Sequence, residues 1–137
     1  MAYPASTKTL HELLTLADGE AIRIKSTVQQ FRDASAAGPV RREAILGLVG
    51  WLDRAIGVWD AVMARGADMV SYAQSQKGTA FNLVEEFTAM RAAAVDLRDW
   101  LAALNDDTGS YSELVDVSSD RLAEFRTKAD AFIATVG

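Results

Sequence analysis

The sequence predicts an all-α protein, an antiparallel bundle of four main helices with a long central second helix. In four separate segments, apolar residues recur with spacings that alternate between four and three, which is typical of one helix face packed against others. No segment shows the alternation and turn chemistry of a β-hairpin. The 137 residues fit a single domain, 1–137, with a tail over residues 1–8 and an irregular connection over residues 105–117.

The first helix is expected from about Leu10 to Ala34. Thr9 and Glu12 form a capping box, in which each side chain bonds a backbone N–H of the first turn. The next residues, 35–39, include Gly38 and Pro39, which suit the end of one helix and the start of the next. Because this connection is short, we expect the first two helices to be antiparallel neighbours. The apolar stripe is Leu10, Leu14, Ala17, Ala21, Ile24, Val28 and Phe31.

The second helix is expected from about Pro39 to Tyr72. Its stripe is Ile45, Leu48, Leu52, Ala55, Trp59 and Val62, and a second apolar group, Val49, Trp51, Ile56, Val58 and Met63, widens the surface as in a central helix. Gly47, Gly50 and Gly57 would allow a packed helix to approach closely. A continuous helix here would span ~51 Å. Either it breaks near Gly66, or its end overhangs the bundle.

The third helix is expected from about Ala80 to Leu104, with Thr79 as its N-cap. Its stripe is Leu83, Phe87, Met90, Ala94, Leu97, Leu101 and Leu104. Residues 105–110 form a stop, and residues 111–117 form either one helical turn or an extended connection. The fourth helix follows over residues 119–136, with Ser118 as its N-cap. Its stripe is Leu122, Phe125, Ala129, Phe132 and Val136.

The residue types needed for most catalytic and metal chemistry are missing from the sequence. It has no cysteine and one histidine, His11, whereas a zinc site needs three or four ligands. The sequence contains neither of the two Glu-x-x-His pairs that a di-iron bundle uses, and it contains no phosphate-binding loop. Residues 105–109 are too compact for a calcium loop. We therefore expect a protein that is not an enzyme, with no catalytic, cofactor-binding or metal-binding residues.

The net charge of −5 is unevenly distributed. Residues 78–120 hold two basic and nine acidic side chains, which would repel a nucleic-acid backbone. This acidic block is either a solvated face or a docking face for a basic partner. The most apolar stretch, 44–63, contains Asp53, Arg54 and Asp60, so we expect a buried helix and no membrane contact. The first eight residues do not resemble a secretion signal, so a virion or cytoplasmic location is expected.

Trp51, Trp59 and Trp100 are expected first of all to fill the bundle core or its edges. The alternative is that one or two of them anchor a protein interface, where tryptophan is enriched among hot spots. Trp51 and Val58 share one line of the second helix, off its main stripe, and a further packed neighbour would explain them as well as a partner would. The candidate protein interface predicted from the sequence comprises Trp51, Ala55, Val58, Val62, Met69, Tyr72, Glu85, Glu86, Asp96 and Asp99.

The alanine-rich helices with few lysines and the closing segment, residues 122–135, resemble small all-helical structural proteins of tailed bacteriophages. This resemblance implies a virion component whose partners are capsid or tail proteins, and it carries over no functional residue. The expected function is a non-enzymatic structural or assembly protein acting through helix-mediated contacts, with itself or virion proteins as partners. The alternative is a small acidic regulatory module, an inhibitor or adaptor, that docks a basic protein. A third class is a bundle enzyme or ligand carrier.

Overall fold

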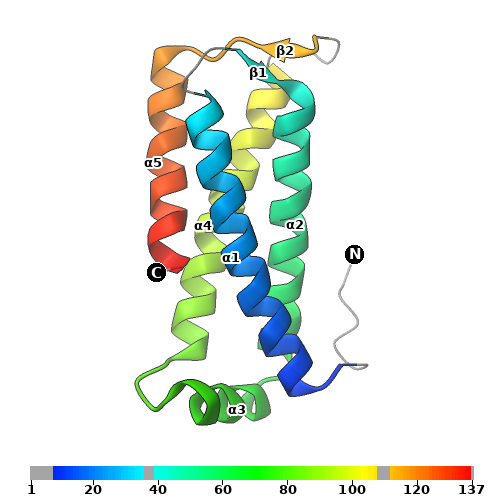
Figure 1. The fold of residues 1–137 in the computed structure, drawn as a ribbon, viewed down its shortest axis with the longest axis vertical. Helices are drawn as coiled ribbons and strands as arrows, with labels where there is room; N and C mark the ends of the chain where they lie inside the picture. The colour runs from blue at the N-terminus through cyan, green and yellow to red at the C-terminus, as the bar shows by residue number, and fades with distance from the viewer. Residues whose placement is uncertain (1–7, 36–38, 108–111, 137) are drawn as a thin grey trace.

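The computed structural model describes residues 8–35, 39–107 and 112–136, and it confirms the all-α class. Four long helices lie side by side, α3 crosses one end, and a two-stranded sheet lies at the other (Figure 1). The helices are α1 (Leu10–Ser35), α2 (Arg42–Ala64), α3 (Ala67–Lys77), α4 (Leu83–Asp107) and α5 (Ser119–Val136). The strands are β1 (Val40–Arg41) and β2 (Leu114–Val115).

The predicted capping box at the start of α1 is confirmed. The Thr9 backbone N–H donates to Glu12 Oε1 over 3.1 Å, and the Glu12 N–H donates to Thr9 Oγ1 over 3.1 Å. The hydrogen bonds from the backbone and then the side chain of Thr9 hold the pKa of Glu12 below its ordinary value. The start of the helix is therefore set by local sequence.

The expectation of a long second helix is wrong. Helix α2 ends at Ala64 after 23 residues, so it is shorter than α1 with 26 and α4 with 25. The chain turns at Gly66, whose φ of 64° lies in the left-handed region that favours glycine. Of the two alternatives for this segment, the break near Gly66 is the one found. Helix α2 also begins later than expected, because Arg41 is extended and belongs to β1.

Helix α3 covers one end of the long helices, against α1 and α4 (Figure 1). Met69 and Ala73 are its buried residues and close that end of the core. The hydroxyl oxygen of Tyr72 lies 2.7 Å from His11 Nδ1, and Lys77 Nζ lies 2.7 Å from Asp18 Oδ1. The segment that would have overhung the bundle, with Met69 and Tyr72, instead forms α3 and packs over the end of the core.

Helix α4 begins at Leu83, three residues later than predicted. Its N-cap is Asn82, whose Oδ1 accepts from the Glu85 N–H over 3.0 Å, so the prediction of Thr79 as the cap is wrong. Helix α5 has the predicted bounds. Its predicted cap is confirmed, since Ser118 Oγ accepts from the Arg121 N–H over 3.3 Å.

The small antiparallel sheet joins two segments far apart in sequence, with Val40 opposite Val115 and Arg41 opposite Leu114. It was not expected, because a two-residue strand gives no alternating pattern. The connection predicted over residues 105–117 is helical through Asp107 and extended at β2. Gly38 and Tyr111 lie outside the described residues.

The predicted stripes meet in one core. Leu14, Leu52, Leu97 and Phe125, one from each long helix, are all buried. Helix α1 packs against α2 and α5, and α4 packs against the same two helices. The largest buried side chain, Trp59, donates its indole N–H to the Ala17 carbonyl oxygen over 3.3 Å. Its polar atom is therefore satisfied inside the core.

Candidate protein-interaction surface

Four of the residues predicted to form an interface lie in the interior. Ala55, Val58, Val62 and Met69 are each 0% exposed, so they form no surface of the folded chain and this part of the prediction is wrong. All four belong to the core, in which α2 and α3 each pack against α1 and α4, so the further packed neighbour explains them. Helical periodicity identified them as apolar, but it could not tell what covers them.

Trp51 is the predicted apolar candidate that the structure leaves at the surface, with 39% of it exposed. Tyr72 is half-buried and bonded to His11. Leu46, five residues before Trp51 on α2, is 49% exposed. Large apolar side chains with this exposure on one helix favour a contact surface.

Gly47 and Gly50 lie between these two side chains on the outer face of α2. In the part of the chain that the structure describes, no atom of a neighbouring element lies within 4 Å of a Cβ built on either glycine. The same holds for Gly57. The expectation that these glycines let another helix of the chain pack closely is therefore wrong, and the face is open.

The open face adjoins a hollow of about 640 Å³ at the sheet end of the molecule. Leu46 and Gly47 are among the α2 residues that line it, and Ser112 and Glu113 line it as well. Leu114, which follows directly, is 54% exposed. We call Leu46, Gly47, Gly50 and Trp51 the α2 face, because these four residues form one continuous strip of the helix.

Positive charge lies along one side of the α2 face. The Arg23 guanidinium carbon stands 5.4 Å from the centre of the Trp51 ring, a cation–π arrangement. Arg54 Nε donates to Glu20 Oε1 over 3.0 Å, and Arg23 lies 3.8 Å from the same oxygen. Arg23 of α1 thus contacts the Trp51 ring, and Arg54 of α2 bonds Glu20 of α1.

The four acidic candidates are all exposed, but two of them are already paired. Asp96 contacts Lys128 of α5 at 2.9 Å, and Asp99 contacts Arg98 at 3.2 Å. No ion pair within the described ranges involves Glu85 or Glu86. The acidic block is therefore partly neutralised by the chain itself.

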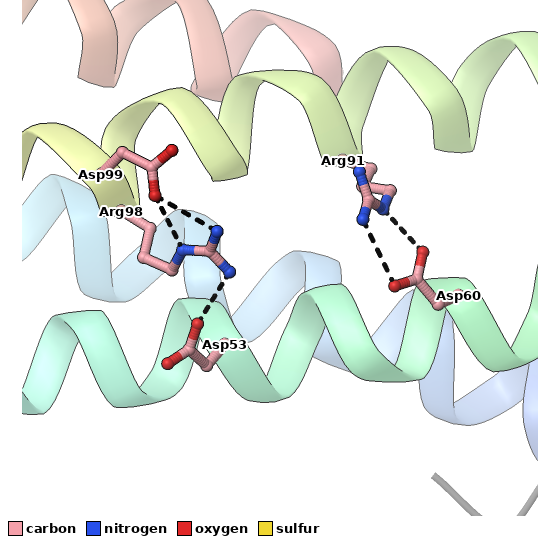
Figure 2. A network of polar contacts seen from close by, with 5 residues as sticks. All are labelled: Asp53, Asp60, Arg91, Arg98 and Asp99. Atoms are coloured by element: carbon pink, nitrogen blue, oxygen red, sulfur yellow. Dashed lines mark hydrogen bonds and ion pairs between the residues drawn. The ribbon is translucent and has the colours of Figure 1, made fainter. Parts of the chain in front are cut away.

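Two arginines of α4 reach aspartates of α2, as Figure 2 shows. Arg91 Nε lies 2.6 Å from Asp60 Oδ1, and Arg98 Nη1 lies 2.9 Å from Asp53 Oδ1. Partial burial works to lower the pKa of Arg98, but hydrogen bonds to Asp53 and Asp99 outweigh it and raise that pKa. These contacts fasten α4 to α2 on the side away from α1.

Sequence reasoning missed two buried charged residues. Glu20 is 2% exposed, and its Oε2 has no hydrogen-bond partner in the described structure. Its position three residues after Ala17 and four before Ile24 places it on the stripe, so the spacing could have revealed it. Arg42 is also buried, but its partners are distant in sequence and no local pattern indicates them.

Groups suited to metal binding or membrane insertion were sought over the same residues. No cluster of three or more His, Asp or Glu side chains that could hold a metal ion occurs over 8–35, 39–107 and 112–136. None of the helices in these ranges combines the length and the apolar character needed to cross a bilayer.

Comparison with known proteins found no similar family, curated protein or solved structure for this chain.

Proposed function

We propose that this chain is a non-enzymatic structural or assembly protein, built as an antiparallel four-helix bundle, that binds other protein chains through the α2 face. Its partners are other copies of itself or, as the resemblance to tailed-phage structural proteins implies, other virion proteins. The observation that carries the proposal is the exposure of Leu46 and Trp51 beside two glycines whose Cβ positions have no atom of another described element within 4 Å.

The α2 face has the chemistry of a helix-docking surface. Leu46 and Gly50 are four residues apart, as are Gly47 and Trp51, so all four residues project from neighbouring turns. The glycines leave room for the backbone of a second helix, while the leucine and the indole supply apolar area on both sides. Tryptophan loses little conformational entropy on binding and is over-represented among hot spots.

The buried charge of the chain also supports a non-enzymatic role. Among the described residues, Glu20 is the one carboxylate in the interior, and it lies against Arg54 rather than against a second acid. General acid–base chemistry in a helical bundle commonly uses a pair of carboxylates with different pKa values. Such a pair is not found among the side chains that the structure describes.

Sedimentation velocity at high micromolar concentration tests the proposal. Wild type should self-associate, whereas Trp51→Glu and Leu46→Glu should sediment as monomers. Burying a carboxylate in the interface costs more free energy than the apolar contact contributes. Ile22→Glu, which alters an exposed apolar residue on α1, is the matched control and should associate as wild type does. A strictly monomeric wild type would contradict self-association. A virion partner retained equally by wild type and Trp51→Glu would contradict the α2 face.

A regulatory acidic module is the second candidate, supported by the exposed Glu85 and Glu86 in the first turn of α4, for which no ion pair is found among the described residues. In this case Glu85→Gln with Glu86→Gln should abolish a salt-sensitive complex with a basic protein. Asp96→Asn with Asp99→Asn should weaken it less, since both aspartates already have cationic partners. Binding that is unchanged in both variants and insensitive to salt would remove this candidate.

A further inference from the structure

Six exposed residues of α2 are placed symmetrically about one point of the helix. The two glycines are innermost, the two large apolar residues lie directly outside them, and an acid and a base lie three residues further out on opposite sides. The six residues are Glu43, Leu46, Gly47, Gly50, Trp51 and Arg54. Reversal of the helix therefore exchanges glycine with glycine, one apolar residue with the other, and the acid with the base.

The geometry of the helix places these six residues on one outward surface. With 3.6 residues per turn, the glycines, the acid and the base lie along one line, and Leu46 and Trp51 lie on opposite edges of that line. The contacts with neighbouring helices agree with this placement. Arg23 of α1 contacts the Trp51 ring, whereas Asp53, seven residues after Leu46, pairs with Arg98 of α4. The central line therefore points outward between the α1 side and the α4 side.

Opposite charges stand at the two ends of this line. Glu43 is exposed and takes part in no ion pair of the described residues. Arg54 bonds Glu20 through Nε, but 50% of its side chain remains exposed. The acid and the base are ~17 Å apart along the helix, too far to pair with each other. A surface with opposite charges at its two ends is complementary to a reversed copy of itself.

The hollow of about 640 Å³ lies at the acidic end of the line. Its two carboxylates, Glu43 and Glu113, are both exposed. Of the two arginines that line it, Arg42 is buried and bonded to backbone carbonyl groups, and Arg41 belongs to β1, before the helix begins. An arginine side chain from another chain would therefore find space and carboxylates here.

We propose that a second copy of this chain docks on the α2 face in the antiparallel direction, related to the first by a two-fold axis at the midpoint of the six symmetric residues. This inference rests on the proposed function, because it names the partner and the arrangement for the same surface. Gly47 of one copy then faces Gly50 of the other, and Glu43 faces Arg54. The two leucines lie along one edge of the contact and the two tryptophans along the other edge.

The charges favour the antiparallel arrangement over a parallel one. A parallel pair would place Glu43 opposite Glu43 and Arg54 opposite Arg54, so like charges would repel at both ends. It would also align the two helix dipoles, which favour opposite directions. The contact involves few residues of each copy, so we expect a weak dimer that forms at high micromolar concentration.

Sedimentation velocity of charge variants tests the pairing of Glu43 with Arg54. Glu43→Arg should weaken self-association at least about tenfold, because it places two arginines opposite each other at both ends of the contact. Glu85→Arg makes the same change of charge at an exposed residue of α4, so it is the matched control and should associate as wild type does.

A mixture of two variants tests whether the charges are complementary between copies. Arg54→Glu combined with Glu20→Gln should sediment as a monomer alone, and it should associate with Glu43→Arg, because each contact then joins an acid to a base. Glu20→Gln is included because Arg54 is the partner of this buried carboxylate.

Pulsed electron paramagnetic resonance tests the direction of the two helices, and it does not depend on the folding of the charge variants. The chain has no cysteine, so a spin label on Asp60→Cys is unique. In the antiparallel pair each label lies ~17 Å from the two-fold axis along the helix, so the two labels are ~35 Å apart. A parallel pair would place them no more than about 25 Å apart.

The outcomes separate this inference from the proposed function. A wild type that stays monomeric at high micromolar concentration would overturn the inference and leave the α2 face open to a virion partner. Self-association that Trp51→Glu abolishes, but that Glu43→Arg leaves unchanged or that gives the short label distance, would overturn the antiparallel arrangement and leave the α2 face as the contact surface.

Discussion

Arg42, the first residue of α2, donates from Nη1 to the backbone carbonyl oxygen of Asn105 over 2.9 Å, 63 residues further along the chain. That carbonyl is one of the last four of α4, which have no partner within the helix. Arg42 Nε also donates to the Ser112 carbonyl oxygen over 2.7 Å, just before β2. A single guanidinium thus joins the start of α2, the end of α4 and the sheet.

Arg42→Met should lower the free energy of unfolding by about 1.5–3 kcal/mol, because it leaves part-buried carbonyl groups without charged donors. Arg42→Lys should lose most of the same stability, since an ammonium cannot reproduce the forked geometry of the guanidinium. Urea denaturation followed by circular dichroism measures both. Arg41→Met, next to it and exposed, is the control and should change stability little. A loss below about 0.5 kcal/mol in Arg42→Met would contradict this role.

The contact between Glu20 and Arg54 predicts strong coupling of their substitutions. Arg54→Met should destabilise the fold by about 1–3 kcal/mol, because it leaves the buried carboxylate without its donor. Glu20→Met combined with Arg54→Met should be less destabilised than Arg54→Met alone, since an apolar pair needs no donor. A double-mutant cycle from urea denaturation measures the coupling. Additive effects would contradict the interpretation.

Two exposed glycines should respond oppositely to alanine. Gly66→Ala should destabilise by about 1–2 kcal/mol, because its φ of 64° is strained for a residue with a Cβ. Gly50→Ala should stabilise the isolated chain by about 0.5–1 kcal/mol, since Gly50 lies inside α2 and no atom of another described element lies within 4 Å of its Cβ position. Thermal unfolding of the two variants checks the signs. Stabilisation of the fold by Gly66→Ala would show that the turn does not need the left-handed conformation.

The exposed ion pair between Arg91 and Asp60 should contribute little to stability. Asp60→Asn should lower the free energy of unfolding by no more than about 1 kcal/mol, and the loss should shrink at high salt. Asp53→Asn should behave similarly, although Arg98 keeps Asp99 as a second partner. Urea denaturation in low and high salt measures the effect. A loss several times larger, or one that salt does not change, would contradict a solvent-screened pair.

The capping box predicts a pH-dependent contribution from Glu12. Because the folded state lowers the pKa of this carboxyl, its contribution is fully present above the unfolded pKa of about 4.3 and is lost as pH falls through the folded value. The stability difference between wild type and Glu12→Gln should therefore disappear at acid pH. Unfolding measured from pH 7 to pH 2 checks this, and a difference that grows as the pH falls would contradict it.

Local sequence was enough to place α1, α5 and most of α4. The Thr9–Glu12 box and Ser118 fix helix starts through contacts only three residues apart, so they can be read directly from the sequence. Local sequence was not enough for the interface prediction, four of whose residues are buried. Trp51 and Val58 share one helical line, yet Trp51 is 39% exposed and Val58 is fully buried, because the packed neighbours cover the two positions to different extents.

The sequence by itself determined the helical class, which residues share each apolar face, and the charge of the chain, because these depend on neighbours within one or two helical turns. Only the tertiary structure decided where the second helix turns, that Arg42 bonds Asn105 and Ser112, and which apolar residues of α2 remain open. These depend on contacts between segments far apart in the chain. A period of 3.6 residues shows that side chains lie on one face, but only the packed neighbours determine whether that face is core or surface.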